Sequence, residues 1–464
     1  MVSTQPDGCS STRRSPVTRT IDSVDHGSLP PGWLEELADF LAIPSINADP
    51  AHAADVTRAA GWVAEKVRAL GGEAEIREDG RLVVGEIAGP PGAPVVLVYG
   101  HYDVQPPDPL ELWETDPFTA EIRGEWLYAR GVADDKGQLW MQLRAIEELV
   151  AAGPLPVTFR VVCDGEEETG GDAIVRFLAT DDEPVDACVV LDGWMKRRNR
   201  PELVVATRGL VALDVEVRTG ARDLHSGHYG GTALNAIHAL ALALTALFPR
   251  GGRLPEPLRA GVTPPSNAEL ASWRELPPGA EELARVGAVP LDERAAEEFY
   301  ERAFAEPSVD VTGILGGKPG LRNTTLVSRA SAGITIRVAP GQDPAVLADA
   351  AERLLREALP PGATLDVTGT DLTPPGILPD SPALHAGRDA FERVFGVRPL
   401  VVRAGGTLPI VAALGARGIP TVMAGLALPD SHTHSPNERM LVETFPLGVA
   451  AARETYRALA TLPR

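Results

Sequence analysis

Hydrophobic residues in the first 200 positions follow two alternating patterns. Apolar positions three and four residues apart predict amphipathic helices, and short continuous apolar runs predict buried strands. The helices are expected at residues 32–43, 54–70, 136–152 and 172–180, and the strands at residues 81–84, 94–99, 157–163 and 187–191. Strands that alternate with helices over this length predict an α/β domain with a mixed but mostly parallel sheet covered by helices.

The pattern changes near residue 208 and returns near residue 381. Residues 210–219 alternate between apolar and polar side chains, which is typical of a strand with one solvated face. The following elements are expected to be helices at 232–248 and 345–359, strands at 331–338 and 364–370, and a proline- and acid-rich stretch at 255–307. Together they predict a smaller α+β domain inserted into the α/β domain.

The α/β character resumes after this insertion. Further elements are expected as helices at 383–394 and 407–414 and a strand at 420–423. The predicted units are a disordered leader at 1–28, the first part of the main domain at 29–206, the smaller domain at 207–378 and the second part of the main domain at 379–464. A chain of 464 residues is too long for one hydrophobic core, which agrees with this division.

Composition and charge exclude several classes of protein. No apolar run reaches the roughly 18 residues of a transmembrane helix. The N-terminal segment lacks the apolar stretch of a secretory signal. The formal net charge of -21 would repel nucleic acid and anionic membranes, so neither is expected as a partner.

The three cysteines have neither metal-ligand spacing nor the pattern of a disulfide framework. Cys9 lies in the leader. Cys163 and Cys188 end apolar runs, and we expect both to be buried thiols. This use of cysteine predicts a reducing, cytoplasmic setting.

Residues of metal-binding type follow several of the predicted strands. His101 and Asp103 end an apolar run, and residues two apart in an extended segment point to the same side. A carboxylate at that place can accept the second ring N–H of a metal-bound imidazole. A capped strand end with a hydrogen-bonded histidine would explain the pair equally well.

The other polar clusters also have structural explanations when each is taken alone. Asp134 and Asp135 precede a helix, where they could cap it or bridge two metal ions. The three glutamates at 166–168 follow a strand. They could form a solvated acidic turn, or they could bind a ligand at the carboxyl end of that strand. Asp192 ends another apolar run, and segment 432–434 carries two histidines. As a set, imidazoles and carboxylates without thiolates suit zinc, manganese or cobalt.

Four motifs, in this order, resemble those of the dinuclear zinc metallopeptidases that include carnosinase, cytosolic nonspecific dipeptidase, aminoacylase and the bacterial desuccinylases. They are Gly-His-Tyr-Asp-Val-Gln-Pro from residue 100, Gly-Val-Ala-Asp-Asp-Lys-Gly from residue 131, Glu-Glu-Thr-Gly from residue 167 and His-Ser-Pro-Asn-Glu from residue 434. The resemblance extends over residues 30–460. Within the family, Tyr102 and Gln105 favour the dipeptidase branch.

The resemblance implies a role for each matching residue. His101, Asp134 and Asp192 would hold one metal ion. Asp134 would bridge to a second ion, held by Glu168 and His434. The cofactor implied is therefore a pair of divalent ions, with zinc as the first choice and manganese or cobalt as alternatives.

The resemblance also assigns the catalytic and substrate-binding positions. Glu167 stands at the place of the family's general base, and Asp103 at that of the residue that orients the first histidine. The main domain would be catalytic, and the smaller one a lid that mediates homodimerisation. From this lid, His225 would reach into the partner subunit's site and stabilise the oxyanion. The family's substrate contacts correspond to Thr325, Arg337, Gly406 and Thr407.

The expected activity is hydrolysis of the amide bond of a dipeptide or short peptide. A hydroxide that bridges the two ions would attack, and Glu167 would take up and return the proton. The alternative enzyme is an N-acyl-amino-acid deacylase of the desuccinylase or deacetylase type, which applies the same chemistry to another acyl group. Outside the enzymes, the alternative is a non-catalytic binding protein of the same fold.

Overall fold

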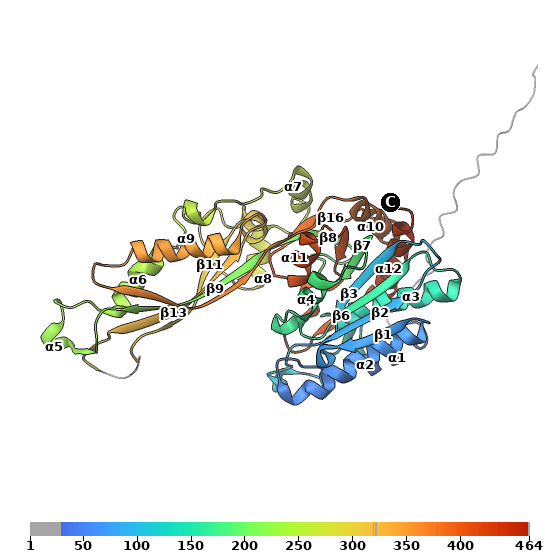
Figure 1. Cartoon of the computed structure of the whole chain (residues 1–464), viewed down its shortest axis with the longest axis horizontal. Helices are drawn as coiled ribbons and strands as arrows, with labels where there is room; N and C mark the ends of the chain where they lie inside the picture. Colours follow the sequence, from blue (N-terminus) through green and yellow to red (C-terminus); the bar gives the residue numbers. More distant parts are fainter. Residues whose placement is uncertain (1–28, 319, 321–322, 463–464) are drawn as a thin grey trace, which may run out of the picture.

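The structure is a computed structural model that describes residues 29–318, 320 and 323–462. The predicted leader, including Cys9, lies outside these residues. Figure 1 shows a larger unit and an elongated smaller unit, each built around its own sheet. No helix in the described ranges is both long and apolar enough to cross a membrane.

The larger unit contains a nine-stranded mixed sheet in the order β1-β2-β6-β3-β7-β17-β8-β15, with β16 paired to β8. Its centre is parallel, because β3 pairs in parallel with β6 and β7, and β17 with β7. Antiparallel pairs join β1 to β2, β2 to β6 and β15 to β8. The strands are β1 Glu73–Arg77, β2 Leu82–Ile87, β3 Val95–His101, β6 Thr158–Asp164, β7 Ala187–Leu191, β8 Glu202–Thr207, β15 Gly376–Ile377, β16 Leu400–Ala404 and β17 Thr421–Ala424. The predicted α/β fold class is confirmed.

Helices cover both faces of this sheet, because its central strands carry apolar side chains on both faces. Val96 and Val98 of β3 pack in one apolar cluster, and Leu97 and Tyr99 pack in another on the opposite face. The first cluster includes the helices α1 Trp33–Leu41, α2 Ala53–Ala69, α3 Lys136–Ala152, α10 Pro382–Phe395 and α12 Thr444–Leu459. The second includes α4 Ala173–Thr180, α7 Asn267–Trp273 and α11 Pro409–Ala416. The ends of the central strands are therefore anchored in a closely packed interior.

The smaller unit contains a four-stranded antiparallel sheet in the order β11-β13-β9-β14, which packs with α6 and α9. Burial alternates along β9 and β13, as the sequence pattern predicts for a sheet with one open face. Its elements are β9 Gly209–Arg218, α6 Ala236–Thr245, β11 Ser308–Leu315, β13 Arg329–Val338, α9 Pro344–Glu357 and β14 Thr364–Thr373. At its far tip in Figure 1 stands α5, next to the short pair of β10 and β12; these are α5 Ser226–Tyr229, β10 Leu224–His225 and β12 Thr325–Leu326.

One stretch of the predicted smaller domain packs on the larger unit instead. Trp273, Leu276 and Tyr300 are buried in the same cluster as Leu400 of β16. The stretch also contains α8 Gly279–Arg285. The predicted domain boundaries at 207 and 378 stay a prediction, and we propose that residues 266–306 belong to the larger unit.

A three-stranded sheet in the order β18-β5-β4 brings distant parts of the chain together. Its strands are β4 Glu121–Arg123, β5 Trp126–Tyr128 and β18 Arg439–Leu441. Because β18 pairs with β5, the C-terminal histidine loop is fastened beside the segment that leads into α3.

The two described cysteines are buried and free, as predicted. Burial raises the pKa of both the Cys163 and the Cys188 thiol, which keeps them protonated and unreactive. The cytoplasmic location inferred from cysteine usage stays a prediction.

Candidate metal centre

Strands β6, β3 and β7 deliver polar residues to one edge of the main sheet. Their parallel pairing brings their carboxyl ends together, which is where α/β sheets place ligands. His101 is the last residue of β3, and Asp192 directly follows β7. The short helix η4 (Glu167–Thr169) follows β6. Asp134 stands immediately before the N-cap residue of α3.

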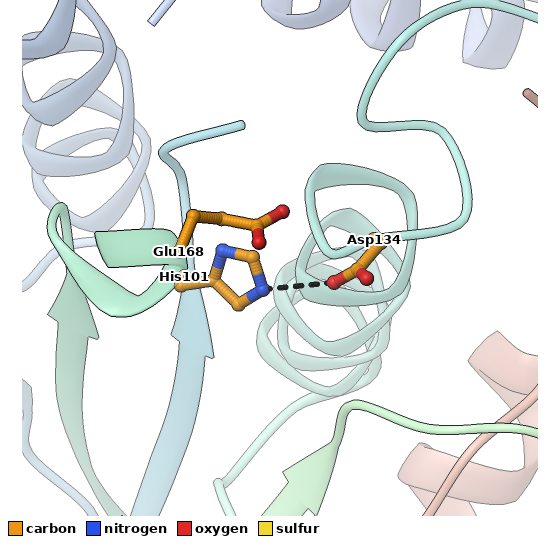
Figure 2. Close-up of side chains that lie close together, drawn as sticks. All are labelled: His101, Asp134 and Glu168. Carbon is orange, nitrogen blue, oxygen red and sulfur yellow. Dashed lines mark hydrogen bonds and ion pairs between the residues drawn. The ribbon is translucent and has the colours of Figure 1, made fainter. Parts of the chain in front are cut away.

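Three of the predicted ligands form a compact group. Ligand atoms of His101, Asp134 and Glu168 all lie within 4.8 Å of one another, and Figure 2 shows the three side chains close together. Nε2 of His101 lies 3.0 Å from Oδ1 of Asp134. Nε2 of His434 lies 3.1 Å from Oδ2 of Asp134 and 3.1 Å from Oε2 of Glu168. Asp134 therefore presents one oxygen to each histidine, which is the arrangement that a bridging carboxylate needs.

Asp103 links the first histidine to the acidic turn. Its Oδ1 lies 3.3 Å from Nδ1 of His101, the ring nitrogen that does not face Asp134. The same carboxylate accepts the backbone N–H groups of Glu167 at 3.2 Å and Glu168 at 3.0 Å. Because Asp103 and His101 are fully buried, these contacts hold the imidazole and the turn in one relative position.

Asp192 has a buried oxygen without a hydrogen-bond partner in the described part of the chain. The residue is 8% exposed, and the unpaired atom is Oδ2. Burial raises the pKa of Asp192 to about 7, and an unpaired buried carboxylate oxygen is costly. A divalent cation would satisfy this oxygen. The donor set of two imidazoles and several carboxylates fits ions of the zinc, manganese or cobalt type.

The acidic groups draw positive charge into the site. Burial lowers the pKa of His101, but its two aspartate neighbours outweigh burial and raise that pKa above its ordinary value. Hydrogen bonds to Asp134 and Glu168 raise the pKa of His434 to about 10. Burial raises the pKa of Glu167 to about 9, although His101 lowers it. Bound cations would supply the same positive charge.

Two residues outside the predicted site also touch its members. Asp135 is fully buried, and its Oδ2 accepts the backbone N–H of His101 at 3.0 Å. Gln105 donates from Nε2 to Oε2 of Glu168 at 2.8 Å. Both residues lie inside the motifs described above, and those motifs could have pointed to them from the sequence.

The predicted substrate-binding and oxyanion residues fall into two separate places. Arg337 on β13 donates from Nη1 to Oγ1 of Thr407 at 2.9 Å, so the smaller unit meets the loop that carries Gly406 and Thr407. His225 and Thr325 are paired residues of β10 and β12. His225 is also the N-cap residue of α5, which stands at the far tip of the smaller unit in Figure 1. Within one chain, the structure thus separates His225 from the metal-binding group.

Comparison with known proteins finds relatives along most of the chain. Residues 97–458 match the family described as Peptidase family M20/M25/M40. The Cysteinylglycine-S-conjugate dipeptidase of Corynebacterium striatum is 30% identical over 421 residues, which cover 87% of this chain and 90% of that protein. The Beta-Ala-His dipeptidase of Mus musculus is 27% identical, with 88% of this chain and 89% of that protein covered. The solved structure of an M20 family metallo-carboxypeptidase from Sulfolobus solfataricus has a TM-score of 0.79 at 25% identity, and the match covers 93% of this chain and 100% of that chain.

Proposed function

Because this chain belongs to peptidase family M20/M25/M40, we propose that it is a metal-dependent dipeptidase that hydrolyses the amide bond of dipeptides or short peptides. The family predicted from the four sequence motifs is confirmed. One observation carries the proposal most directly: Asp134 presents its two carboxylate oxygens to His101 and His434. The two relatives described above are both named as dipeptidases, which supports dipeptides as the substrate class.

The five predicted ligands would hold two divalent ions. We assign His101 and Asp192 to one ion, Glu168 and His434 to the other, and Asp134 to both. Zinc is our first choice, with manganese or cobalt as alternatives. Ions bound there would lower the pKa of a water molecule and polarise the scissile carbonyl.

Glu167 is the proposed general base. It would accept a proton from the attacking water and deliver that proton to the leaving amine. Burial raises the pKa of Glu167 in the metal-free protein, and two cations bound beside it would lower that pKa and leave the carboxylate ionised and able to accept a proton. Its backbone N–H donates to the carboxylate of Asp103, which fixes the position of the Glu167 backbone beside the proposed ligands.

We infer that a second copy of the chain completes the site. His225 is exposed and is the N-cap residue of α5, which stands in Figure 1 at the tip of the smaller unit, away from the strands that carry the metal-binding group. A two-fold homodimer would place each tip at the other subunit's site. There His225 would donate a hydrogen bond to the developing oxyanion, and Thr325 would contact the substrate.

Replacing Arg337 with alanine is expected to raise KM for a free dipeptide about 10- to 100-fold, because a charge-assisted hydrogen bond contributes about 1.5–3 kcal/mol. The proposed partner of Arg337 is the substrate's C-terminal carboxylate, so kcat should change less. The measurement is steady-state kinetics with a free dipeptide and with its C-terminal amide. Arg329→Ala, an exposed arginine on the same strand, is the matched control. A variant at 337 that still prefers the free carboxylate would contradict the assignment.

Metal-free protein is expected to have a lower Tm than metal-loaded protein. An ion that binds only the folded state stabilises it by about 2.7 kcal/mol when its free concentration is 100 times Kd. Calorimetry after dialysis against a chelator, with and without added zinc or manganese, measures the shift. The double variant His101→Ala/His434→Ala should lose it. An equal shift in that variant would place the metal elsewhere.

The activity itself is tested with a panel of dipeptides and N-acyl amino acids, each assayed with added zinc, manganese or cobalt. We expect turnover of dipeptides to be faster. Faster turnover of N-acyl amino acids would favour the deacylase alternative. Tight metal binding without turnover of either class would favour a non-catalytic binding protein.

A further inference from the structure

The loop that carries Asp134 is held by a buried carboxylate from the far end of the sequence. Glu438 is fully buried and directly precedes β18, whose pairing with β5 brings it to this loop. The backbone N–H of Ala129 donates to the carbonyl of Glu438 at 3.2 Å and continues the pairing by one step. The side chain of Glu438 therefore lies against the segment that leads from β5 to α3.

Both carboxylate oxygens of Glu438 are occupied. Oε1 accepts the backbone N–H groups of Ala133 at 2.9 Å and Asp134 at 3.1 Å. Oε2 accepts the backbone N–H of Gly131 at 3.0 Å and Nη1 of Arg130 at 2.7 Å. Four donors around one carboxylate fix its orientation, and a side chain with only one acceptor oxygen cannot satisfy them all.

Arg130 extends this network to two neighbouring loops. Its side chain is 1% exposed, and Nη2 donates to the carbonyls of Pro106 at 3.2 Å and Ser435 at 3.4 Å. Pro106 closes the motif that contains His101, and Ser435 directly follows His434. The buried pair thus joins the three segments that carry His101, Asp134 and His434.

We propose that Glu438, assisted by Arg130, is a positioning residue that holds Asp134 in register with His434 and thereby sets the affinity of the metal site. The proposal rests on the proposed function, because it takes Asp134 and His434 as metal ligands. A bridging carboxylate must bind two ions at once, so a small rotation of residues 131–134 would weaken both contacts. Glu438 itself binds no ion in this scheme, because its oxygens are already occupied.

The test compares Glu438→Gln with Glu269→Gln. In Glu438→Gln, an amide NH₂ group replaces one acceptor and faces N–H donors. In Glu269→Gln, a second buried pair, with Arg403 at 2.5 Å, loses its charge in the same way without involving a proposed ligand. Both variants should lower Tm. Only Glu438→Gln should weaken zinc binding, by about 10- to 100-fold, as loss of a supporting contact usually does.

Three measurements separate positioning from general destabilisation. Zinc affinity is obtained by competition with a chromogenic chelator, and amide hydrogen exchange is followed at residues 131–134 in the metal-free protein. Kinetics are then measured across zinc concentrations. For Glu438→Gln we expect faster exchange and a kcat that falls at low zinc and recovers at high zinc, with KM unchanged. If its zinc affinity and exchange match those of Glu269→Gln, the proposal is overturned.

Arg130→Lys covers the case in which Glu438→Gln does not fold. It leaves the carboxylate and its three backbone donors in place and removes the guanidinium contacts to the two carbonyls. Measurably weaker zinc binding is expected, and unchanged affinity overturns the proposal. A wild-type chain that binds none of zinc, manganese and cobalt refutes the proposed function instead. The exchange measurement, made without metal, still decides the positioning role.

Discussion

Glu167→Gln is expected to keep its bound metal and to lose about 10²–10⁴-fold in kcat, which is the usual contribution of a general base. Glutamine preserves the shape of the side chain but cannot take the proton from the attacking water. The backbone N–H that Asp103 accepts at 3.2 Å is unaffected, so the turn should stay in place. Steady-state kinetics and metal analysis of the same preparation check the result. A kcat near that of the wild type would refute the assignment.

Glu166 provides the matched control for this experiment. Its Oε1 accepts the backbone N–H of Ala173 at 2.8 Å, and its Oε2 lies 3.4 Å from Nη1 of Arg81. These contacts support the start of α4 rather than the metal-binding group. Glu166→Gln should therefore lower Tm and leave kcat close to the wild-type value. Equal losses of kcat in both variants would indicate that the turn, and not proton transfer, had been disturbed.

His225→Ala is expected to lower kcat about 10²–10³-fold, the usual cost of removing one oxyanion donor. The fold should survive, because the ring is exposed at the tip of the smaller unit, where Nδ1 accepts the backbone N–H of Gly227 at 3.0 Å. His228 stands beside it, with the two ring centroids 4.9 Å apart. His228→Ala is therefore the control, and its kcat should stay near that of the wild type.

Mixing His225→Ala with Glu167→Gln subunits tests whether the histidine acts on the partner subunit. Neither homodimer should be active. Each mixed dimer would contain one site with both an intact base and an intact histidine, so random exchange in a two-fold dimer should restore about a quarter of wild-type activity. A histidine that acted within its own subunit would give mixed dimers without a complete site. Absence of recovery after verified subunit exchange would therefore reject the shared site.

The sequence pattern located the elements whose signals are local. Helix α3 and strand β7 have the predicted bounds, because glycine, proline or charged residues close their apolar patterns. Strands β8 and β16 were missed. Each contains a buried charged residue that is satisfied by partners outside its own strand. Glu202 accepts the backbone N–H of Lys196, and Arg403 donates to the carboxylate of Glu269 and to the carbonyls of Thr263 and Pro264. Helix α12 was also missed, because Pro446 and Gly448 in its first turns resemble helix breakers.

The same distinction between local signals and long-range contacts applies to the candidate site. The predicted ligands were visible as polar residues at strand ends and as an ordered set of motifs, and the structure brings His101, Asp134, Glu168 and His434 together. The contact between Asp134 and Glu438 spans 304 positions, and no local pattern predicts it. Arg337 was assigned by resemblance alone, since an arginine on an alternating strand is more often solvated. Its contact with Thr407 required the two units to be placed in space.

The proposed assignment of residues 266–306 to the larger unit would have a mechanical consequence. The chain would then pass between the two units after β8, before α7, before β11 and after β14. A smaller unit joined by two connections can rotate about one axis relative to the larger unit, whereas four connections restrict that rotation. In a homodimer, a smaller unit held rigidly in this way would fix the distance from its tip to the partner subunit. The gap between a subunit's tip and its partner's metal site would be set once, at assembly, and that gap would limit the length of peptide that the enzyme admits.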